Sequence, residues 1–491
     1  MSGFPIEKHR VKFRVLSRDN LEAIHLATLE ILERTGVKVY SEKILKMLNE
    51  AGCVVDFEKQ SALIPSYLVN EALMKKGSVR LYARNPKYDV KLDGRHVHIN
   101  TDGIGVNTLD LETGQRRSST RDDIKKSAII ADALDDIHVY WPMVSALDIP
   151  AHVRHLHEII TSFENTEKHV QIETTTQPEE AKYIIDIAAA IAGSEDELRK
   201  RPVLSSLHCS FAPLQHGGGD TEAALEFAKA GIPIVFMGMP QAGATGPVTL
   251  AGSIVVNNAE VLSALVISQL AWPGAPVIYG AGAAAFDMRT GSRAAGGPEH
   301  GLMDAALGEL AKYYGMSSIV GGFSANANVP GGQACYEKII SGLPPFLSGC
   351  DLIVGIGLIE DCATLPFEQI IIDAEIVKMI HRLAQGIEVK DETLALDVID
   401  KVGPGGHYLS ERHTREYFRK EHFIPEITDR RAYESWLKDG AKTIVDRAKE
   451  SVRTILKEHR PMPLAKDIRQ QVMTIIEKAD KKLAKAETTS H

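Results

Sequence analysis

The sequence predicts an α/β protein built on a (β/α)8, or TIM, barrel, with an α+β extension before it and a helical segment after it. Eight apolar, β-branched runs each precede a helix-like stretch, and runs such as PIVFMGM and CDLIVGIGLI are apolar throughout. Strands of that kind are buried on both faces, as in a parallel sheet. Eight such units suffice to close a barrel. The alternative is an open doubly wound sheet, with one or two strands misassigned.

The eight units alternate regularly along the middle of the chain. The expected strands are His96–Val106, His138–Leu147, His169–Thr174, Val203–Phe211, Ile232–Met239, Val277–Ala284, Ser318–Ser324 and Leu352–Ile359. The expected helices that follow them are Arg121–Leu134, His152–Glu164, Pro178–Ile191, Thr221–Ala230, Ala251–Leu270, Gly301–Tyr314, Gln333–Leu347 and Phe367–Leu383.

These elements divide the chain into three parts. Residues 1–95 form an extension with helices at Leu21–Thr35 and Ile44–Ala51 and a hairpin at Val79–Val97 that turns at Asp93-Gly94. Residues 96–387 form the barrel and carry the active site. Residues 388–491 form a mostly helical segment that packs on the barrel.

Composition narrows the class of protein. The 491 residues are 44% apolar and 25% charged, and the net charge of −9 argues against wholesale binding to nucleic acid or to an anionic membrane. The five cysteines are odd in number and contain no CxxC pair, which predicts no disulfide framework, no structural zinc and a cytoplasmic location. The apolar stretch Ser253–Trp272 contains Asn257, Asn258 and Glu260, so we expect a buried helix and not a membrane span.

A barrel of this type places its chemistry at the carboxyl ends of the strands. Those ends are rich in Gly, Ala and Ser and poor in charge, which predicts a roomy, weakly polar pocket. The runs are NTDGIG (100–105), ETTTQP (173–178), HCSFAPL (208–214), GMPQAGATGP (238–247), YGAGAAAFDMRTG (279–291), GGFSANANVPGGQA (321–334) and GLIEDCATLP (357–366).

Three motifs point elsewhere, but each has a simpler interpretation. Gly280–Ala285 fits the dinucleotide pattern GxGxxA, yet a turn-rich stretch follows it where a helix should begin, which favours a barrel loop. His152, His155 and His157 do not share one helix face, so a metal site is not indicated. Cys209 is either a nucleophile or an inert core cysteine, and the second is the commoner outcome.

Several long blocks of the sequence are recognisable. MPQAGATGPVTLAGSIVVNNAEVLSALVISQLAWPGAPVIYGAGAAAFDMRTG, GGFSANANVPGGQACYEK, DAEIVKMI and VGPGGHYLSERHTREYFRKEHFIPEITDRRAYESW occur in this order. The chain resembles the trimethylamine:corrinoid methyltransferase superfamily over most of its length. The resemblance implies a (β/α)8 barrel that moves a methyl group from a methylated amine to cob(I)alamin. The corrinoid would be carried by a separate small protein docked at the barrel mouth, and no metal would be bound by the chain itself.

The resemblance also bears on the substrate. The trimethylamine enzymes of the superfamily use pyrrolysine at the end of a late strand, whereas this sequence has standard residues there, near Phe323. The branch that lacks pyrrolysine uses quaternary amines, which implies glycine betaine and release of a tertiary amine such as dimethylglycine. A quaternary nitrogen leaves as a neutral amine without a general acid, so no catalytic residue is singled out. The site would orient and desolvate the substrate.

The expected substrate contacts follow from the two ends of a betaine. Aromatic rings can wall the ammonium group, and we assign this role to Phe323 and Phe286, with Phe211 nearby. A carboxylate in an apolar pocket needs hydrogen-bond donors; the first candidates are His208, Arg289 and His407, followed by Gln241 and Gln333. Glu360 completes the set. Arg289 could instead pair with Asp287 or Glu299 and only hold its loop.

Two other functions remain open on the residues alone. They are a barrel lyase or aldolase-like enzyme acting on a small carboxylate, and a quaternary-amine-binding protein without activity. For the methyltransferase, a homo-oligomer is expected.

Overall fold

A computed structural model describes residues 3–489 of the chain, with side chains described up to residue 484. Its centre is a closed barrel of eight parallel strands, because the last strand pairs with the first. This confirms the predicted barrel and excludes the open sheet. In order around the barrel, the strands are β7 (His96–Thr101), β10 (Val139–Tyr140), β11 (His169–Ile172), β12 (Leu204–Cys209), β14 (Ile234–Gly238), β16 (Val277–Ala281), β19 (Ser318–Val320) and β20 (Leu352–Ile356).

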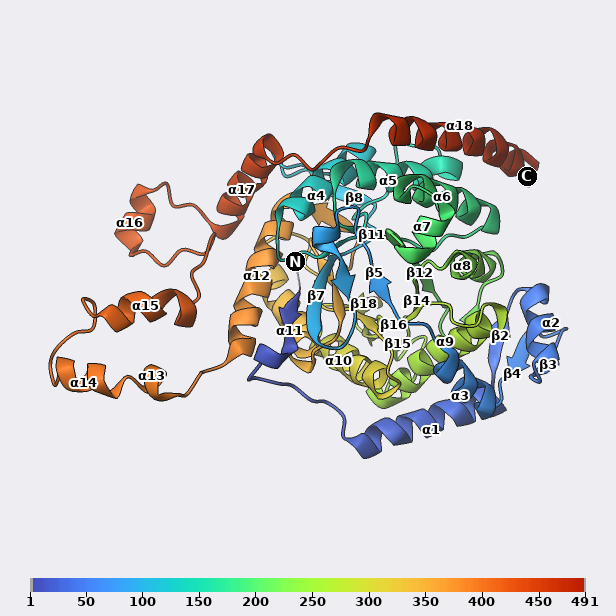
Figure 1. Cartoon of the computed structure of the whole chain (residues 1–491), viewed down its shortest axis with the longest axis horizontal. Coiled ribbons are helices and arrows are strands. Elements are labelled where there is room, and N and C mark those ends of the chain that lie inside the picture. The colour runs from blue at the N-terminus through green and yellow to red at the C-terminus, as the bar shows by residue number, and fades with distance from the viewer. Residues whose placement is uncertain (1–2, 490–491) are drawn as a thin grey trace.

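A ring of helices surrounds these strands (Figure 1). One main helix follows each strand, as the sequence predicts: α4 (Arg121–Ala133), α5 (Ala151–Asn165), α6 (Pro178–Ala192), α8 (Gly219–Ala230), α9 (Leu250–Ala271), α10 (Pro298–Tyr313), α11 (Gly332–Ser348) and α12 (Phe367–Gln385). The short α7 (Glu195–Lys200) follows α6. Helix α9 is long and apolar enough to cross a membrane, but 78% of its most apolar window is buried inside the protein.

Side chains alternate between two cores along the barrel strands. Val97, Ile99, Val170 and Ile172 belong to the large core between the sheet and the helices. Val139, Leu207, Val235 and Ile278 belong to a smaller core inside the barrel. Because successive residues of a strand face opposite sides, this parity fixes which side chains can reach the mouth.

The N-terminal extension covers one flank and one end of the barrel. It contains α1 (Arg18–Arg34), α2 (Glu42–Glu50), α3 (Ser66–Lys75), the strands β2 (Val37–Val39), β3 (Val54–Asp56) and β4 (Ser61–Leu63), and the hairpin β5 (Arg80–Leu81) and β6 (Val90–Lys91). The hairpin turns at residues 82–89 and not at the predicted Asp93-Gly94, which instead joins β6 to β7. Leu81, Val90 and Leu92 extend the inner core and close the amino end of the barrel.

The C-terminal part consists of two dissimilar halves. Helix α17 (Ile444–Glu458) packs on α12 and α4, and α18 (Lys466–Thr489) packs on α5 and α6. Before them, a segment of short helices projects from the side of the barrel (Figure 1). These helices are α13 (Asp391–Leu394), α14 (Leu396–Val402), α15 (Arg412–Glu421) and α16 (Tyr433–Lys438).

A buried ammonium group joins the ends of the last two barrel strands. Lys338 of α11 donates hydrogen bonds to the carbonyl oxygens of Phe323 at 2.7 Å and Gly355 at 2.8 Å. Its Nζ also lies 2.9 Å from Oδ2 of Asp373 on α12, and both side chains are fully buried. Asp373 accepts a further hydrogen bond from the backbone N–H of Gly357. The cluster therefore ties together β19, β20 and the two helices that follow them.

Replacing Lys338 with Met should destabilise the fold by about 3–5 kcal/mol, because Asp373 would be left as a buried, unpaired charge. The measurement is the free energy of unfolding in urea. Lys390→Met is the matched control, since Lys390 pairs with Glu388 at the surface, and it should leave the unfolding curve unchanged. Equal curves for Lys338→Met and the wild type would contradict the role of this cluster.

Candidate active site

Two acidic side chains meet at the mouth of the barrel, directly after β7 and β11. Ile99 and Ile172 face the outer core, so the residues that alternate with them face the barrel interior. Asp102 and Glu173 therefore face the interior, as do Asn100 and Gln171 one layer deeper. Both amide side chains are buried and have no hydrogen-bond partner among the described residues. They form a polar floor beneath the two acids that can donate to or accept from a bound molecule.

Burial makes both acids hard to ionise. Asp102 is almost fully buried, its Oδ2 lies 3.0 Å from Sγ of Cys362, and burial raises its pKa above the ordinary value. Glu173 is partly open to solvent in the mouth but is surrounded by protein on its barrel side. Burial raises the pKa of Glu173 to about 7; His155 opposes the shift and the nearby Asp102 adds to it. A cation bound between the two acids would favour their ionised forms.

Sulfur atoms and an indole ring form the less polar side of the mouth. Cys209 Sγ lies 3.7 Å from Sδ of Met239, and Met237 and Trp141 belong to the inner core. Gly103 leaves room for Trp141, because a Cβ there would lie 2.5 Å from the indole nitrogen. Burial raises the pKa of the Cys209 thiol to about 12, so it is a thiol at neutral pH and a poor nucleophile.

A largely buried cation, Arg293, faces these acids from a hairpin over the mouth. The hairpin consists of β17 (Ala284–Asp287) and β18 (Ser292–Ala294). From β18, Arg293 reaches Oδ1 of Asp361 at 2.6 Å and donates to the carbonyl oxygen of Gly282 at 3.1 Å. Burial disfavours its charge, but Asp361 and neighbouring acids hold the pKa of Arg293 above its usual value. The positive charge of Arg293 acts to lower the pKa of Asp102, so the two groups interact electrostatically.

A buried pair stands behind Arg293. Nε2 of His300 lies 2.8 Å from Oδ2 of Asp304, both on α10, and Nδ1 of His300 lies 3.5 Å from the Arg293 guanidinium. The pair fits only because residue 321 is glycine: a Cβ there would lie 2.5 Å from His300 Nε2 and 2.6 Å from Asp304 Oδ2.

The loop after β20 holds its acid and its thiol in a strained backbone conformation. Glu360, Asp361 and Cys362 have φ values of 56°, 51° and 68°, in the left-handed region that non-glycine residues rarely adopt. The backbone N–H groups of Glu360 and Asp361 donate to the carbonyl oxygens of Ala327 and Ala325, both at 2.9 Å. Such strain concentrates at functional sites, and here it directs Asp361 to Arg293 and Cys362 to Asp102.

Two grooves lie beside the ends of the barrel. The one on the mouth side has a volume of about 810 Å³ and lies between the β17–β18 hairpin and α11, where Arg293, Asn326 and Tyr336 line it. The other, of about 550 Å³, lies at the amino end of the barrel beside Arg80 and Trp272. Only the first adjoins the cluster of buried titratable groups.

The two leading aromatic candidates have different positions. Phe323 is fully buried and its ring packs against Gly342 of α11, where a Cβ would lie 2.5 Å from the ring. Phe323 therefore packs onto α11 and does not line the open mouth in this structure. Phe286 is half-buried in β17, directly opposite Arg293 in the hairpin. Opposite residues of an antiparallel pair share a face, so Phe286 does lie near the mouth. Phe211 is 56% exposed on the rim.

None of the three leading carboxylate donors reaches the mouth. His208 faces outward from β12, buried against Phe236 and the residues of α9 around Glu260. Burial lowers its pKa to about 4. The Arg289 side chain is 89% exposed and pairs with Asp287, which is the alternative role that the sequence analysis gave it. His407 is exposed in the projecting C-terminal segment.

The remaining candidates lie on the rim, and the side chains of two of them already have partners. Gln241 is half-buried in the short strand β15 (Gln241–Ala242), beside β17. Gln333 donates to Glu337 within α11 at 2.9 Å. Glu360 binds Arg116 at 3.0 Å and accepts a hydrogen bond from the Thr364 hydroxyl. None of these three contacts the buried acids in the described structure.

Sequence reasoning missed the residues that do form the cluster. Asp102, Glu173, Cys209, Arg293 and Cys362 were not proposed as substrate contacts, although the first three and Cys362 stand in the strand-end runs quoted from the sequence. The available signal was a lone acid directly after an apolar strand, in NTDG and QIETTT. Among the described residues, no group of three His, Cys, Asp or Glu side chains is arranged to hold a metal ion.

Comparison with known proteins decides the family. Residues 3–484 match the family described as trimethylamine methyltransferase (MTTB). This chain belongs to that family. The trimethylamine methyltransferase MttB of Desulfitobacterium hafniense is 38% identical over 94% of this chain and 93% of its own length. Its counterpart from Methanosarcina barkeri is 36% identical over 96% of each. The glycine betaine methyltransferase of Desulfitobacterium hafniense is 32% identical, over 96% of this chain and 98% of its own length.

Membership in the MTTB family makes this protein a methyltransferase, which overturns the two alternatives of a lyase and a binding protein without activity. Among solved structures, the monomethylamine methyltransferase MtmB of Methanosarcina barkeri is similar over 97% of this chain and 89% of its own, with a TM-score of 0.52 and 12% identity. At that identity the likeness bears on the fold alone, and it agrees with the barrel.

Replacing Gly321 with Ala should cost about 1–3 kcal/mol of stability, because the added methyl group overlaps the His300–Asp304 pair. It should also reduce methyl transfer, since that pair backs Arg293. Gly332→Ala is the control: a Cβ at Gly332 meets nothing within 4 Å, so stability and activity should not change. Thermal unfolding and initial rates measure both, and a neutral Gly321→Ala would contradict the packing described.

Proposed function

We propose that this enzyme transfers a methyl group from a quaternary amine to a corrinoid carried by a separate protein, and that glycine betaine is the foremost substrate. The observation that carries the proposal is the charge arrangement at the mouth: the buried acid Asp102, the partly buried acid Glu173 and one largely buried cation, Arg293. A betaine has the complementary arrangement of one ammonium and one carboxylate group.

The acids and the sulfur-rich wall suit the ammonium end. Methyl groups on nitrogen carry much of its positive charge but donate no strong hydrogen bonds, so soft contacts with Met237, Met239 and Trp141 together with nearby carboxylates bind them well. Phe286 can contribute a further ring from the hairpin. Stripping water from the ammonium group beside these residues also brings it closer to reaction.

Arg293 replaces Arg289 as the proposed anchor for the carboxylate end. It is held in place by Gly282 and Asp361, and a guanidinium can bind a carboxylate through two parallel hydrogen bonds. The proposed anchor therefore lies in the same loop as the residue first predicted, four positions later. A zwitterion held at both ends would have only one orientation in the mouth.

The rim supports docking of a protein that delivers the methyl acceptor. Loops after six of the barrel strands, and the first turns of α11, expose large apolar side chains, which commonly marks an interaction surface. These residues are Val106, Leu147, Phe211, Met239, Val248, Met288, Val329 and Tyr336. A reduced corrinoid docked there would supply the nucleophile that accepts the methyl group. On the substrate, the carbon–nitrogen bond breaks and its electron pair stays on nitrogen, so the product is a neutral tertiary amine and no general acid is needed.

The direct test mixes the enzyme with reduced cobalamin and glycine betaine, choline, tetramethylammonium or trimethylamine, and follows the visible spectrum of the corrinoid. We expect methylation of the corrinoid with glycine betaine in preference to choline, which lacks the carboxylate. Arg293→Gln should reduce that preference at least about tenfold, the value of roughly one charge-assisted hydrogen bond. Arg289→Gln, in the same hairpin but exposed, should keep the wild-type preference. Turnover of trimethylamine alone would overturn the proposed substrate class.

Glu173 should make substrate affinity depend on pH. Its carboxyl has a pKa of about 7, and only its ionised form attracts an ammonium group. Affinity for glycine betaine should therefore fall as the pH drops below 7, by up to tenfold per pH unit, and level off above 7. The quaternary nitrogen itself does not titrate. Isothermal titration between pH 5.5 and 8.5 measures this, and Glu173→Gln should flatten the profile. A wild-type profile already flat in that range would remove Glu173 from the ammonium site.

A further inference from the structure

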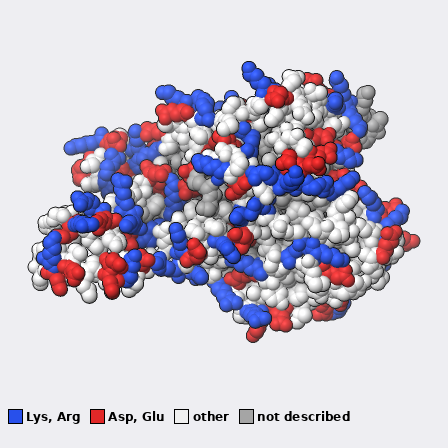
Figure 2. All heavy atoms as spheres, viewed as in Figure 1, with Lys and Arg blue, Asp and Glu red and all other residues white. Residues whose placement is uncertain are grey.

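The groove at the amino end of the barrel is lined by cations, and no Asp or Glu of the described structure lines it. Its volume of about 550 Å³ lies in the range of pockets that hold small molecules. Its walls are the segment from α3 into β5, the ends of α7 and α8, and the turn between α9 and β16. Four exposed basic side chains line it: Arg80, Arg199, Lys200 and Lys229. Figure 2 shows a band of Lys and Arg over the region where Figure 1 places α7 and α8, on a chain whose net charge is −9.

Two of these cations have no carboxylate partner among the described residues. The Arg80 guanidinium lies over the ring of Tyr82, 5.7 Å from its centroid, and the Lys229 ammonium lies over the ring of Trp272 at the same distance. By contrast, Lys200 forms an ion pair with Glu197 at 2.7 Å. Arg80 and Lys229 therefore keep charges that a bound anion can neutralise.

Helix ends account for only part of this positive charge. Cations commonly lie near the carboxyl ends of helices, where they offset the helix dipole. Arg199 has this role, because it donates to the carbonyl oxygen of Lys229 at the end of α8, at 2.9 Å. Arg80 lies in a strand, and the Lys229 ammonium lies over an indole ring. The groove therefore holds more positive charge than the helix ends use.

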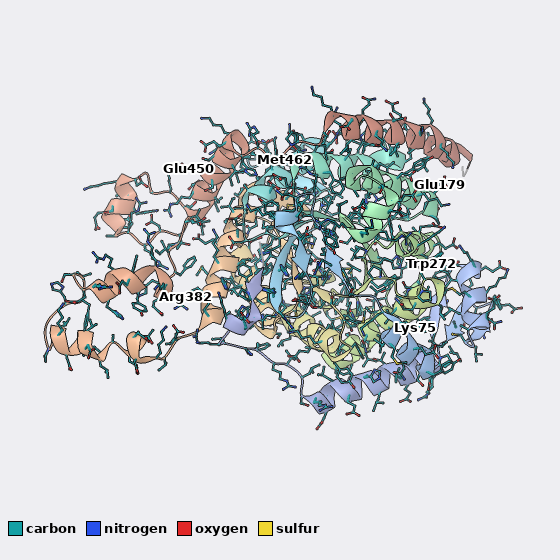
Figure 3. The ribbon with its side chains drawn as sticks, in the orientation of Figure 1. Lys75, Glu179, Trp272, Arg382, Glu450 and Met462 are labelled. Atoms are coloured by element: carbon teal, nitrogen blue, oxygen red, sulfur yellow. The ribbon has the colours of Figure 1, made fainter. Side chains whose placement is uncertain are left out.

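The groove also offers a flat apolar surface on a rigid frame. Trp272, labelled in Figure 3, directly follows α9 and is 40% exposed. An exposed indole face can stack on another planar ring. A Cβ at Gly77 would lie 2.3 Å from the carbonyl oxygen of Gly274, so the backbones on two sides of the groove are in contact. A groove already formed in this way loses little conformational entropy when a ligand binds.

We propose that this groove binds an anion that joins phosphate groups to a planar ring, such as a nucleoside di- or triphosphate. The Arg80 fork suits phosphate oxygens, Lys229 adds a second positive charge, and the Trp272 ring stacks on the base. A long nucleic acid strand fits less well, because the exposed Glu195 and Asp196 at the start of α7 would repel it beyond the groove. The groove lies at the end opposite the mouth, so its occupant is distinct from the methyl donor.

The test titrates the full chain with ATP, and separately with pyrophosphate, by calorimetry in magnesium-free buffer at about 0.15 M salt. The groove variant is Arg80→Gln with Lys229→Gln. The matched control is Lys43→Gln with Lys125→Gln, which removes the same charge from exposed positions outside the groove. Trp272→Leu removes the ring alone. All of these side chains are exposed, so the fold should not change, which circular dichroism verifies.

We expect ATP to bind the wild type and the control equally, with a Kd below about 1 mM, and pyrophosphate to bind more weakly. The groove variant should bind ATP at least about tenfold more weakly, since charge-assisted hydrogen bonds are lost. Trp272→Leu should weaken the binding of ATP and leave that of pyrophosphate unchanged.

Three results would overturn the proposal. The first is no saturable binding of ATP to the wild type at millimolar concentration. The second is an equal loss in the groove variant and the control, or no loss in either, because binding would then depend on overall charge or lie elsewhere. The third is unchanged ATP binding by Trp272→Leu. No readout uses methyl donor or corrinoid, so the result is independent of the proposed methyl transfer.

Discussion

The buried ammonium group of Lys338 sets the shape of the barrel mouth, because it draws together backbone that would otherwise not approach so closely. Burying this charge is unfavourable, and contacts with one carboxylate and two carbonyl oxygens offset the free energy of desolvation. Between those carbonyls the backbone is too close for side chains: a Cβ on Gly355, whose φ is 122°, would lie 1.8 Å from the carbonyl oxygen of Gly322. The loops after β19 and β20 start from this contact, and they carry Asp361 and Cys362 to Arg293 and Asp102.

Charge at the mouth is unevenly balanced, and this imbalance suits a cationic substrate. Arg293 has its own acid in Asp361, whereas Asp102 and Glu173 have no cation within hydrogen-bonding distance among the described residues. Their raised pKa values express the cost of leaving two carboxyls largely surrounded by protein without a counter-charge. A quaternary ammonium group relieves that cost without donating a proton, so binding and desolvation act together. The sulfur atoms and the indole supply contacts that do not compete with the acids for the charge.

The barrel could be predicted from the sequence because burial on both faces makes each strand a continuous apolar run, and eight such runs leave few topologies. The active site could be predicted only to the level of the strand ends. Successive residues of a strand face opposite sides, so an error of one position decides whether a side chain faces the mouth or the helices. His208 and Cys209 are neighbours, and the second faces inward. Phe323 has a φ of 42°, and its ring lies against α11. No pattern in GGFSANAN predicts this orientation. In the Gly-rich stretch after β16, nothing distinguished Arg289 at the tip of an unforeseen hairpin from Arg293 inside it.

The exposed apolar residues around the mouth are arranged in a way that suits a short-lived contact. They stand singly on separate loops, so a partner docked on the rim would meet scattered apolar contacts within a polar surface and could dissociate quickly. This arrangement suits a carrier that must leave after each methyl transfer, as the proposed function requires.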